Sequence, residues 1–256
     1  MDRAGAKIGV VGAGSWGTAL ASLLGTKGYV VDLWAYEPEV RQSISCDSEN
    51  KLFLPEIRLS KNIRVTADLG QAVTGKDLVL MVVPSHVMRR MGERASGYIG
   101  ENTVVVSAAK GIELGTHLTM TGVLSEVFPG HGRYLAVLSG PSFASEVALN
   151  VPTVVTAAAV DEGVAEFVQQ VFAAPFFRVY TNADVIGVEL GGAVKNIIAI
   201  ASGIVEGLGL GLNSRAALIT RGLTEIRRLG IHMGANPHTF SGLAGIGDLI
   251  LTCTGN

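Results

Sequence analysis

The sequence predicts an α/β protein: an N-terminal Rossmann-type domain with a mostly parallel sheet, followed by an all-helical domain. Three observations support this prediction. Short apolar segments alternate with helical segments over the first two thirds of the 256 residues. A glycine-rich motif follows the first apolar segment directly. After about residue 184 only helical patterns remain. We therefore expect a dinucleotide-binding domain at residues 1–187 and a helical substrate domain at residues 188–256.

Eight segments have the length and composition of buried strands. Parallel strands covered on both faces are continuous apolar runs, which also explains a composition of 48% hydrophobic and only 16% charged residues. The predicted strands are residues 7–11, 30–34, 63–66, 78–83, 103–106, 135–138, 154–157 and 176–180. Helices are predicted between several of them, at residues 87–95 and 163–172, the second with Asp161 as its N-cap.

The last third of the chain has the pattern of packed helices. Residues 188–206 are apolar around nearly the whole helix, which predicts a buried helix. An amphipathic helix is expected at residues 214–229, with Asn213 as its N-cap and Gly230 as its stop signal. A third helix is expected to start near Asp248. The uncharged segment 197–205 is shorter than the ~20 residues that cross a bilayer.

Charge and cysteine content narrow the functional classes. The net charge of −2 gives no electrostatic reason to expect binding to nucleic acid or to an anionic membrane. The first nine residues lead into the glycine motif and not into an apolar signal core. Cys46 and Cys253 lack metal-site spacing and form no disulfide framework. We therefore expect a soluble cytoplasmic protein with no metal site.

The glycine motif Gly12-x-Gly14-x-x-Gly17 has the spacing of a dinucleotide-binding loop. Gly12 permits the turn out of the strand, Gly14 lets the backbone approach a pyrophosphate, and Gly17 lets the helix pack on the sheet. Amides near Ser15 and Trp16 would then face the phosphates from a helix N-terminus. Glycines also occur in ordinary turns, but the strand before this motif and the helix after it favour cofactor binding.

The end of the second predicted strand bears on the choice between NAD and NADP. An acidic residue at this edge commonly binds the ribose 2′-hydroxyl of NAD. Here Asp32 is expected inside the strand and Glu37 beyond its tip, so that Ala35 and Tyr36 form the edge. Without a carboxylate there, a 2′-phosphate is not repelled, and Arg41 lies within reach of it. This pattern favours NADP(H), with NAD(H) tolerated.

Six motifs along the chain resemble those of bacterial NAD(P)-dependent glycerol-3-phosphate dehydrogenases. They occur in the same order as in that family, at residues 13–21, 83–88, 107–113, 138–147, 189–198 and 245–256. The resemblance implies a cytoplasmic homodimer that transfers hydride reversibly between NAD(P)H and dihydroxyacetone phosphate. The product, sn-glycerol 3-phosphate, supplies phospholipid synthesis.

The resemblance also assigns roles to three ionisable residues. Lys195 matches the general acid–base, Lys110 a lysine that contacts cofactor and substrate, and Asp248 a carboxylate beside the catalytic lysine. Burial in an apolar helix would lower the pKa of Lys195 into a useful range. Other interpretations are a Lys195 that extends to the surface and a solvated Lys110. For Asp248 the sequence alone favours a helix N-cap.

Several further positions match substrate or cofactor contacts of the family. Gly140, Ser142 and Ala144 belong to a Gly-Pro-Ser loop that could also be a simple turn. Asn196 and Thr252 match substrate contacts. His86 and His232 are expected in a loop and on the surface, and neither is assigned a role.

The family's phosphate-binding residues follow the position of Asn256, so the sequence as given predicts an incomplete substrate pocket. We expect weak turnover and self-association through uncovered apolar helix faces. Two other functions stay open from the sequence. One is a dehydrogenase of the 3-hydroxyacid type, which also uses a helix lysine. The other is a dinucleotide-binding sensor without turnover.

Overall fold

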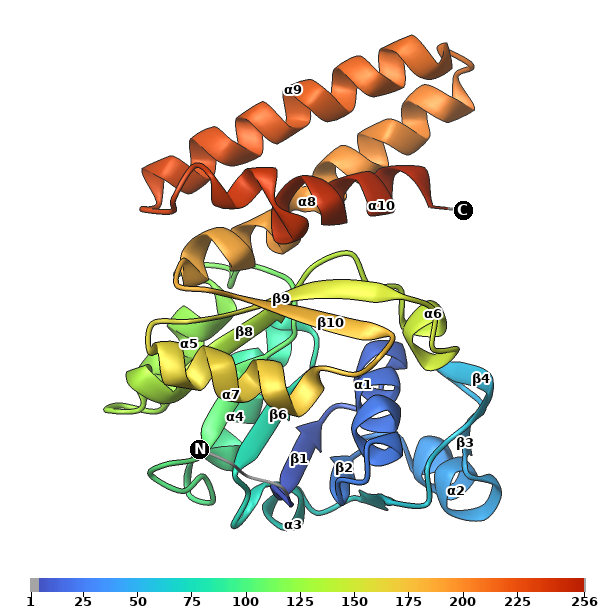
Figure 1. Cartoon of the computed structure of the whole chain (residues 1–256), viewed down its shortest axis with the longest axis vertical. Helices are drawn as coiled ribbons and strands as arrows, with labels where there is room; N and C mark the ends of the chain where they lie inside the picture. Colours follow the sequence, from blue (N-terminus) through green and yellow to red (C-terminus); the bar gives the residue numbers. More distant parts are fainter. Residues whose placement is uncertain (1–4, 256) are drawn as a thin grey trace.

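An eight-stranded sheet forms the centre of the N-terminal part in the computed structural model, which describes residues 5–255 (Figure 1). Across the sheet, the strands are β10 (Phe177–Asn182), β9 (Thr153–Ala159), β8 (Leu135–Ser139), β7 (Val104–Ser107), β6 (Leu78–Met81), β1 (Ile8–Val11), β2 (Val31–Trp34) and β5 (Ile63–Thr66). From β5 to β8 this is the order 3-2-1-4-5-6 of a dinucleotide-binding sheet. The direction of chain progression reverses between β1 and β6, and ligands bind at such a point.

All eight predicted strands are present, with ends that differ by at most two residues. The sheet is mostly parallel, as predicted, but β9 runs antiparallel to β8, and β10 is parallel to β9. A small antiparallel pair, β3 (Glu49–Asn50) and β4 (Leu54–Arg58), was not predicted from the sequence. This pair follows helix α2 (Pro38–Asp47).

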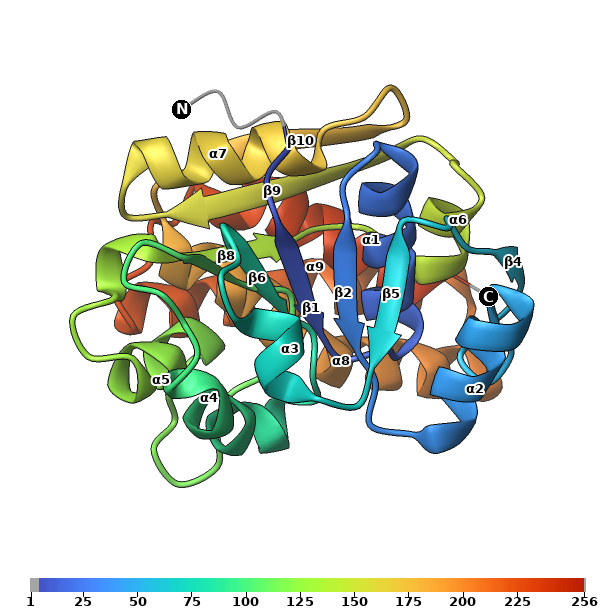
Figure 2. The ribbon, with the colours of Figure 1, turned by 90° about the horizontal axis from the view of Figure 1, so that it is seen from below.

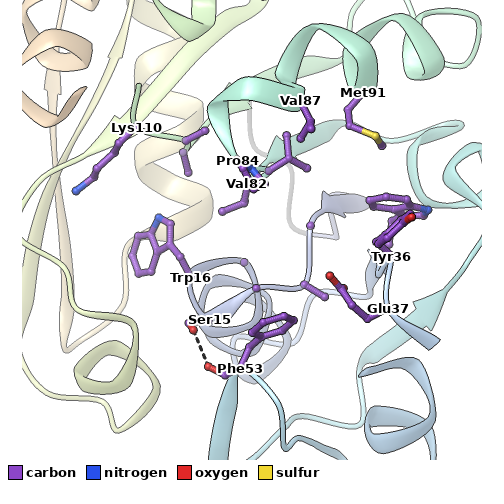
Figure 3. A pocket seen from close by; sticks show the side chains of 18 of the residues that line it. Ser15, Trp16, Tyr36, Glu37, Phe53, Val82, Pro84, Val87, Met91 and Lys110 are labelled. Carbon is purple, nitrogen blue, oxygen red and sulfur yellow. Dashed lines mark hydrogen bonds between the residues drawn. The ribbon is translucent and has the colours of Figure 1, made fainter. Parts of the chain in front are cut away.

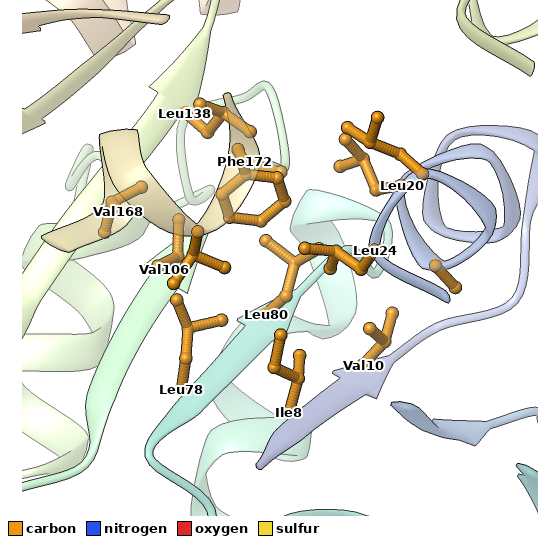
Figure 4. Close-up of a cluster of buried hydrophobic side chains, with 14 of the residues drawn as sticks. Ile8, Val10, Leu20, Leu24, Leu78, Leu80, Val106, Leu138, Val168 and Phe172 are labelled. Atoms are coloured by element: carbon orange, nitrogen blue, oxygen red, sulfur yellow. The ribbon is translucent and has the colours of Figure 1, made fainter. Parts of the chain in front are cut away.

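Helices cover both faces of the sheet (Figure 2). On one face, α1 (Ser15–Thr26) and α7 (Glu162–Phe172) pack on apolar side chains of β1, β6 and β7. Figure 4 shows this core, in which Leu20 and Leu24 meet Phe172 above Ile8 and Leu80. On the other face lie α3 (Leu69–Val73), α4 (Met88–Ser96) and α5 (Met120–Val127). Double-sided coverage explains the continuous apolar strands.

Shorter elements complete this part of the chain: helix α6 (Ala144–Ala148) and the 3₁₀ turns η1 (Ser85–Val87) and η2 (Gly132–Tyr134). The predicted cap of α7 is confirmed, because the Asp161 carboxylate accepts hydrogen bonds from the amides of Gly163 and Val164.

The reversal of β9 determines where the next helix begins. Because β9 and β10 run opposite to β8, β10 ends at the edge of the sheet away from the carboxyl ends of β1, β6 and β7. Helix α8 (Val185–Gly207) then runs back across the sheet. Val188 packs against Val137 of β8, and Gly192 lies beside Ser139, at the end of that strand. Three residues later, α8 places Lys195 at the ligand-binding edge.

The remaining elements are α9 (Gly211–His232), the 3₁₀ turn η3 (Thr239–Ser241), the π-helical turn η4 (Leu243–Gly247) and α10 (Asp248–Thr254). Helices α8, α9 and α10 lie together above the sheet in Figure 1. The expected domain boundary at residue 187 falls in the first turn of α8, and it stays a prediction. Asn256, the last residue of the sixth motif, lies outside the described residues.

The predictions for this helical part need three corrections. Only the first half of α8 is buried, because Ile197, Ile200 and Ile204 are 69%, 68% and 57% exposed. Helix α9 begins at Gly211, so Asn213 lies inside it and does not cap it. The same helix continues past Gly230, whose backbone instead packs closely against the Phe240 ring.

Candidate active site

A cavity of about 700 Å³ opens at the carboxyl ends of β1, β6 and β7 (Figure 3). Its wall includes the glycine loop after β1, residues 82–84 after β6 and residues 108–110 after β7. Helix α4 contributes Met91 and Arg94, and the β3–β4 hairpin contributes Phe53. The cavity therefore lies at the reversal point of the strand order, where dinucleotides bind in sheets of this kind.

The glycine loop has the predicted geometry. Gly12 has φ +115°, and a Cβ there would lie 2.5 Å from the carbonyl oxygen of Val82. A Cβ at Gly17 would collide with the Gly12 carbonyl oxygen. Gly14 is different, because a Cβ on it would have no protein atom within 4 Å. The open space at Gly14, in front of the first amides of α1, suits a pyrophosphate group.

The cavity has two chemically different ends. In Figure 3, Lys110 and Trp16 lie at one end, while Tyr36 and Glu37 lie at the other. The Arg94 guanidinium lies 5.8 Å from the centre of the Trp34 ring, and both residues line the cavity. A cation above an aromatic face, beside an exposed tyrosine, gives the Tyr36 end surfaces on which an adenine ring can stack.

The expectation that this edge lacks a carboxylate is wrong. Ala35 is buried, with its amide bonded to the Thr66 carbonyl, whereas the Glu37 side chain lies on the cavity wall. Pro38 is the first residue of α2, so Glu37 is in an extended conformation just before that helix. The Arg41 guanidinium donates to the carbonyl oxygens of Ala35 and Tyr36, at 2.8 and 2.7 Å. Arg41 therefore stabilises the turn at Ala35 and Tyr36 through those two hydrogen bonds.

Three ionisable side chains meet beyond the Lys110 end of the cavity. Asp248 accepts from Lys195 Nζ through Oδ1 at 2.5 Å and from Lys110 Nζ through Oδ2 at 2.6 Å. Lys195 also donates to Thr252 Oγ1 at 2.6 Å, and Thr252 donates to the Asp248 carbonyl at 2.7 Å. Lys110 further donates to the Gly140 carbonyl oxygen at 3.3 Å.

Burial makes these charges chemically significant. The Asp248 side chain is 1% exposed, and those of Lys195 and Lys110 are 10% and 25% exposed. Burial lowers the pKa of Lys110 to about 8, although the Asp248 carboxylate opposes this shift. With two ammonium groups and one carboxylate, the cluster carries one excess positive charge. Such a cluster can stabilise an oxyanion and can donate a proton to it.

Close packing brings the three residues together. A Cβ at Gly192 would lie 2.8 Å from Ser139 Oγ and 3.3 Å from Lys110 Cδ, so only a glycine lets α8 lie this close to Lys110. A Cβ at Gly191 would likewise collide with the Ala244 carbonyl of η4. Because η4 leads directly into α10, Asp248 is already in helical conformation and points at the lysines. The N-cap interpretation of Asp248 is therefore wrong, since Gly247 is at that position.

The structure brings together only some of the other predicted site residues. Ser142 lines the cavity, and its hydroxyl donates to Gly140 O at 3.0 Å. Gly140 has φ +144° and would crowd Val155 if it carried a Cβ. Ala144 is the first residue of α6 and is not among the residues that line the cavity. Asn196 is exposed on α8 and is not part of the cluster of Lys110, Lys195 and Asp248.

Several residues of the cavity wall were not predicted from the sequence. Arg90, Met91 and Arg94 of α4 line the cavity, as do Phe53 and Glu37. Helix α4 was predicted, but periodicity alone does not show which of its faces borders a ligand. Within residues 5–255, no group of three or more His, Cys, Asp and Glu side chains is arranged to hold a metal ion.

Comparison with known proteins identifies one family. The family models described as NAD-dependent glycerol-3-phosphate dehydrogenase N-terminus and C-terminus match residues 7–165 and 184–256. A glycerol-3-phosphate dehydrogenase [NAD(P)+] of Geobacter sp. is 57% identical over 251 residues, which cover 98% of this chain and 75% of the relative. One from Moorella thermoacetica is 55% identical, covering 96% and 73%.

Solved structures show the same relationship. The crystal structure of glycerol-3-phosphate dehydrogenase from Coxiella burnetii has a TM-score of 0.93 and 42% identity, and the match covers 98% of this chain and 77% of that one. The Saccharomyces cerevisiae enzyme has a TM-score of 0.86 and 30% identity, with 98% and 78% covered. The chain therefore belongs to the NAD-dependent glycerol-3-phosphate dehydrogenase family.

Proposed function

We propose that this chain reduces dihydroxyacetone phosphate reversibly to sn-glycerol 3-phosphate, with the reacting carbonyl between the cavity and the lysine–aspartate cluster. The bound NAD(P)H supplies the hydride. The residues present fit that cofactor, because the cavity joins a helix N-terminus with open space at Gly14 to a stacking surface at Trp34 and Arg94. The product supplies phospholipid synthesis.

Lys195 is the proton donor in the direction of reduction. As carbon C2 accepts hydride, its oxygen gains negative charge and takes a proton from the Lys195 ammonium. Asp248 and Thr252 fix the position of Nζ through bonds of 2.5 and 2.6 Å. The Lys110 ammonium adds a second positive charge next to the same carboxylate. In the direction of oxidation, the neutral Lys195 amine takes up the proton of the alcohol.

The observation that carries the proposal is the burial of Lys195 between Asp248 and Thr252. A sensor without turnover has no need of a buried ammonium held in this way. The test is NADPH oxidation by the purified chain with dihydroxyacetone phosphate, compared with carboxylated keto acids. Oxidation of NADPH by a keto acid alone would favour the 3-hydroxyacid type of dehydrogenase instead.

Both dinucleotides are proposed as cofactors of this one site. The predicted preference for NADP(H) depended on the absence of a carboxylate from the ribose end, and Glu37 supplies one there. Selectivity then depends on the balance between Glu37, which favours a ribose 2′-hydroxyl, and the guanidinium of Arg94.

We also propose a cytoplasmic homodimer that binds neither membrane nor nucleic acid. By length and composition, helix α8 could cross a bilayer. It is longer than the uncharged segment 197–205 that lies within it. Its first half, however, carries buried Glu189 and Lys195, and both bond to other elements of the protein. These contacts support a core helix. The exposed isoleucines of its second half are available for contact with a second chain.

A further inference from the structure

A charged cluster outside the cavity connects the Lys110 loop to helix α4. Arg89, on α4, donates from Nε to Glu113 Oε1 at 2.9 Å and from Nη2 to Glu113 Oε2 at 2.8 Å. Arg89 Nη2 also donates to Glu126 Oε2 of α5 at 2.6 Å. The Thr116 hydroxyl donates to Glu113 Oε2 at 2.6 Å. A bidentate arginine–carboxylate pair fixes orientation as well as distance.

This cluster holds the segment that carries Lys110. Glu113 follows Lys110 by three residues, and between them Gly111 packs directly on η1, where a Cβ would lie 2.5 Å from Ser85 Cβ. The loop is therefore attached at two points to one continuous unit, η1 and α4. The opposite side of that unit is the cavity wall formed by Val87, Arg90, Met91 and Arg94.

We infer that Arg89 and Glu113 are positioning residues, which hold the Lys110 loop against α4 so that the Lys110 ammonium meets Asp248. Neither side chain touches the cavity, so neither is assigned a chemical step. The inference rests on the proposed role of Lys110 in the active site. It adds that one rigid unit places both the cofactor wall and the lysine.

The charge state of the pair suits a permanent attachment. Arg89, followed by Thr116, lowers the pKa of the Glu113 carboxyl to about 2, so the pair stays charged wherever the enzyme works. The Glu113 side chain is only 16% exposed, whereas that of Glu126 is 55% exposed. Exposed pairs of single contacts contribute little to stability. Glu126 is thus a matched control: it binds the same arginine but is not on the Lys110 loop.

The test measures the titration of Lys110 in the whole chain. The protein is acylated briefly with acetic anhydride over a series of pH values, and labelling of Lys110 is quantified by peptide mass spectrometry. In the wild type and in Glu126→Gln, we expect an apparent pKa near the lowered value of about 8. In Glu113→Gln the loop loosens and the ammonium gains water, so the apparent pKa rises toward the ordinary lysine value. Arg89→Lys keeps the charge but loses the bidentate geometry, and we expect the same direction of change.

Activity provides a second readout. Glu113→Gln should lower kcat for dihydroxyacetone phosphate about 10-fold, within the loss that a shift of about 1 Å in a catalytic group can cause. NADPH affinity should change less, because the glycine loop and α4 keep their places in the cavity wall. If the Lys110 titration is the same as in the wild type in both Glu113→Gln and Arg89→Lys, or shifts equally in Glu126→Gln, the inference is overturned. Circular dichroism shows which variants fold, and if only one of Glu113→Gln and Arg89→Lys folds, that variant decides.

The labelling experiment needs no substrate, so it tests the positioning role even in a protein that lacks turnover. A Lys110→Met variant with full activity would instead overturn the proposed role of Lys110, whatever the labelling shows. The two failures are therefore distinguishable.

Discussion

Asp248 and Lys195 are 53 residues apart in the sequence, yet Oδ1 of one lies 2.5 Å from Nζ of the other in a site that is almost closed to water. Two helices bring them together, α8 crossing the sheet and α10 following a π-helical turn. Buried charges of this kind are stable only when each is paired. Removal of either partner therefore leaves the other as a buried charge without its counter-charge.

Replacing Asp248 with asparagine is expected to lower the pKa of Lys110 below about 8, because the carboxylate raises that pKa in the native protein. The same change leaves two ammonium groups without a counter-charge. We expect a loss of unfolding free energy on the order of 3 kcal/mol, as when one partner of a buried ion pair is removed. Urea unfolding measures the stability, and pH-dependent labelling measures the pKa. An unchanged Lys110 pKa would show that Asp248 is not its main electrostatic partner.

Replacing Lys195 with methionine should reduce turnover by ~10²–10⁴-fold, the usual contribution of a general acid–base. NADPH affinity should change little, because Lys195 is not among the residues that line the cofactor cavity. Steady-state kinetics and calorimetry measure the two effects. Lys61→Met, at an exposed loop position, is the matched control. A rate near that of the wild type would assign proton transfer to another group.

Replacing Gly14 with valine should abolish dinucleotide binding and leave the fold intact. A Cβ at residue 14 has no protein atom within 4 Å, so the added side chain extends into the space assigned to the pyrophosphate. Gly203→Val is the control, because Gly203 has equally open surroundings on α8, far along the chain from the loop. Calorimetry with NADPH measures affinity and circular dichroism measures the fold. Unchanged affinity in Gly14→Val would place the phosphates elsewhere.

Replacing Glu37 with glutamine should raise affinity for NADPH relative to NADH by about 10-fold. This factor corresponds to about 1.4 kcal/mol. That energy is larger than the repulsion of two like charges in bulk water and smaller than their repulsion near a protein surface. The ratio of the two dissociation constants gives the result directly. Glu39→Gln is the control, since Glu39 is exposed on α2 outside the cavity lining. If the ratio is the same in the wild type and in both variants, Glu37 does not discriminate between a 2′-hydroxyl and a 2′-phosphate.

Stability should depend on pH through two lysines with lowered pKa values. Burial lowers the pKa of Lys27 to about 8, and its ammonium donates to the carbonyls of Gln170 and Val171. The pKa of Lys110 is also lowered to about 8. Between about 8 and the ordinary value of 10.5, the unfolded chain binds more protons than the folded one, so the free energy of unfolding gains a rising contribution. Below about 8 both states are protonated and the contribution is constant.

The measurement compares urea unfolding of the wild type with that of Lys27→Met across this range. The stability of the wild type relative to the variant should increase as pH rises from about 8 to about 10.5. Lys27→Arg retains a charge throughout the range and should show no such rise. A constant difference between wild type and Lys27→Met would mean that Lys27 titrates normally.

The central sheet and the glycine loop could be predicted because their signals are local. Apolar runs of strand length and a Gly12–Gly17 spacing depend only on neighbours in the sequence. The positions of Lys110 and Lys195 followed from the family resemblance. Their contact with Asp248 depends on α8 lying close to Lys110, which the small residues Gly191 and Gly192 permit.

The failures have a common cause, since each depends on what precedes or faces a segment. Asp248 could be an N-cap only if the chain before it were not helical. The preceding segment, η4, is helical. The apolar second half of α8 predicts burial, but no described element covers Ile197 or Ile200. Glu37 enters the cavity because Pro38 starts α2 immediately after it. Periodicity in the sequence does not encode these neighbours.

The Asp248 carboxylate is shared between two parts of the molecule, since Lys195 belongs with it to the helical part and Lys110 to the sheet-based part. The Lys195–Asp248 bond lies within the helical part, whereas the Lys110–Asp248 bond joins the helical part to the sheet. One carboxylate thus serves both as an internal tie of the helices and as a link between the two parts of the chain, so its loss would remove both contacts at once.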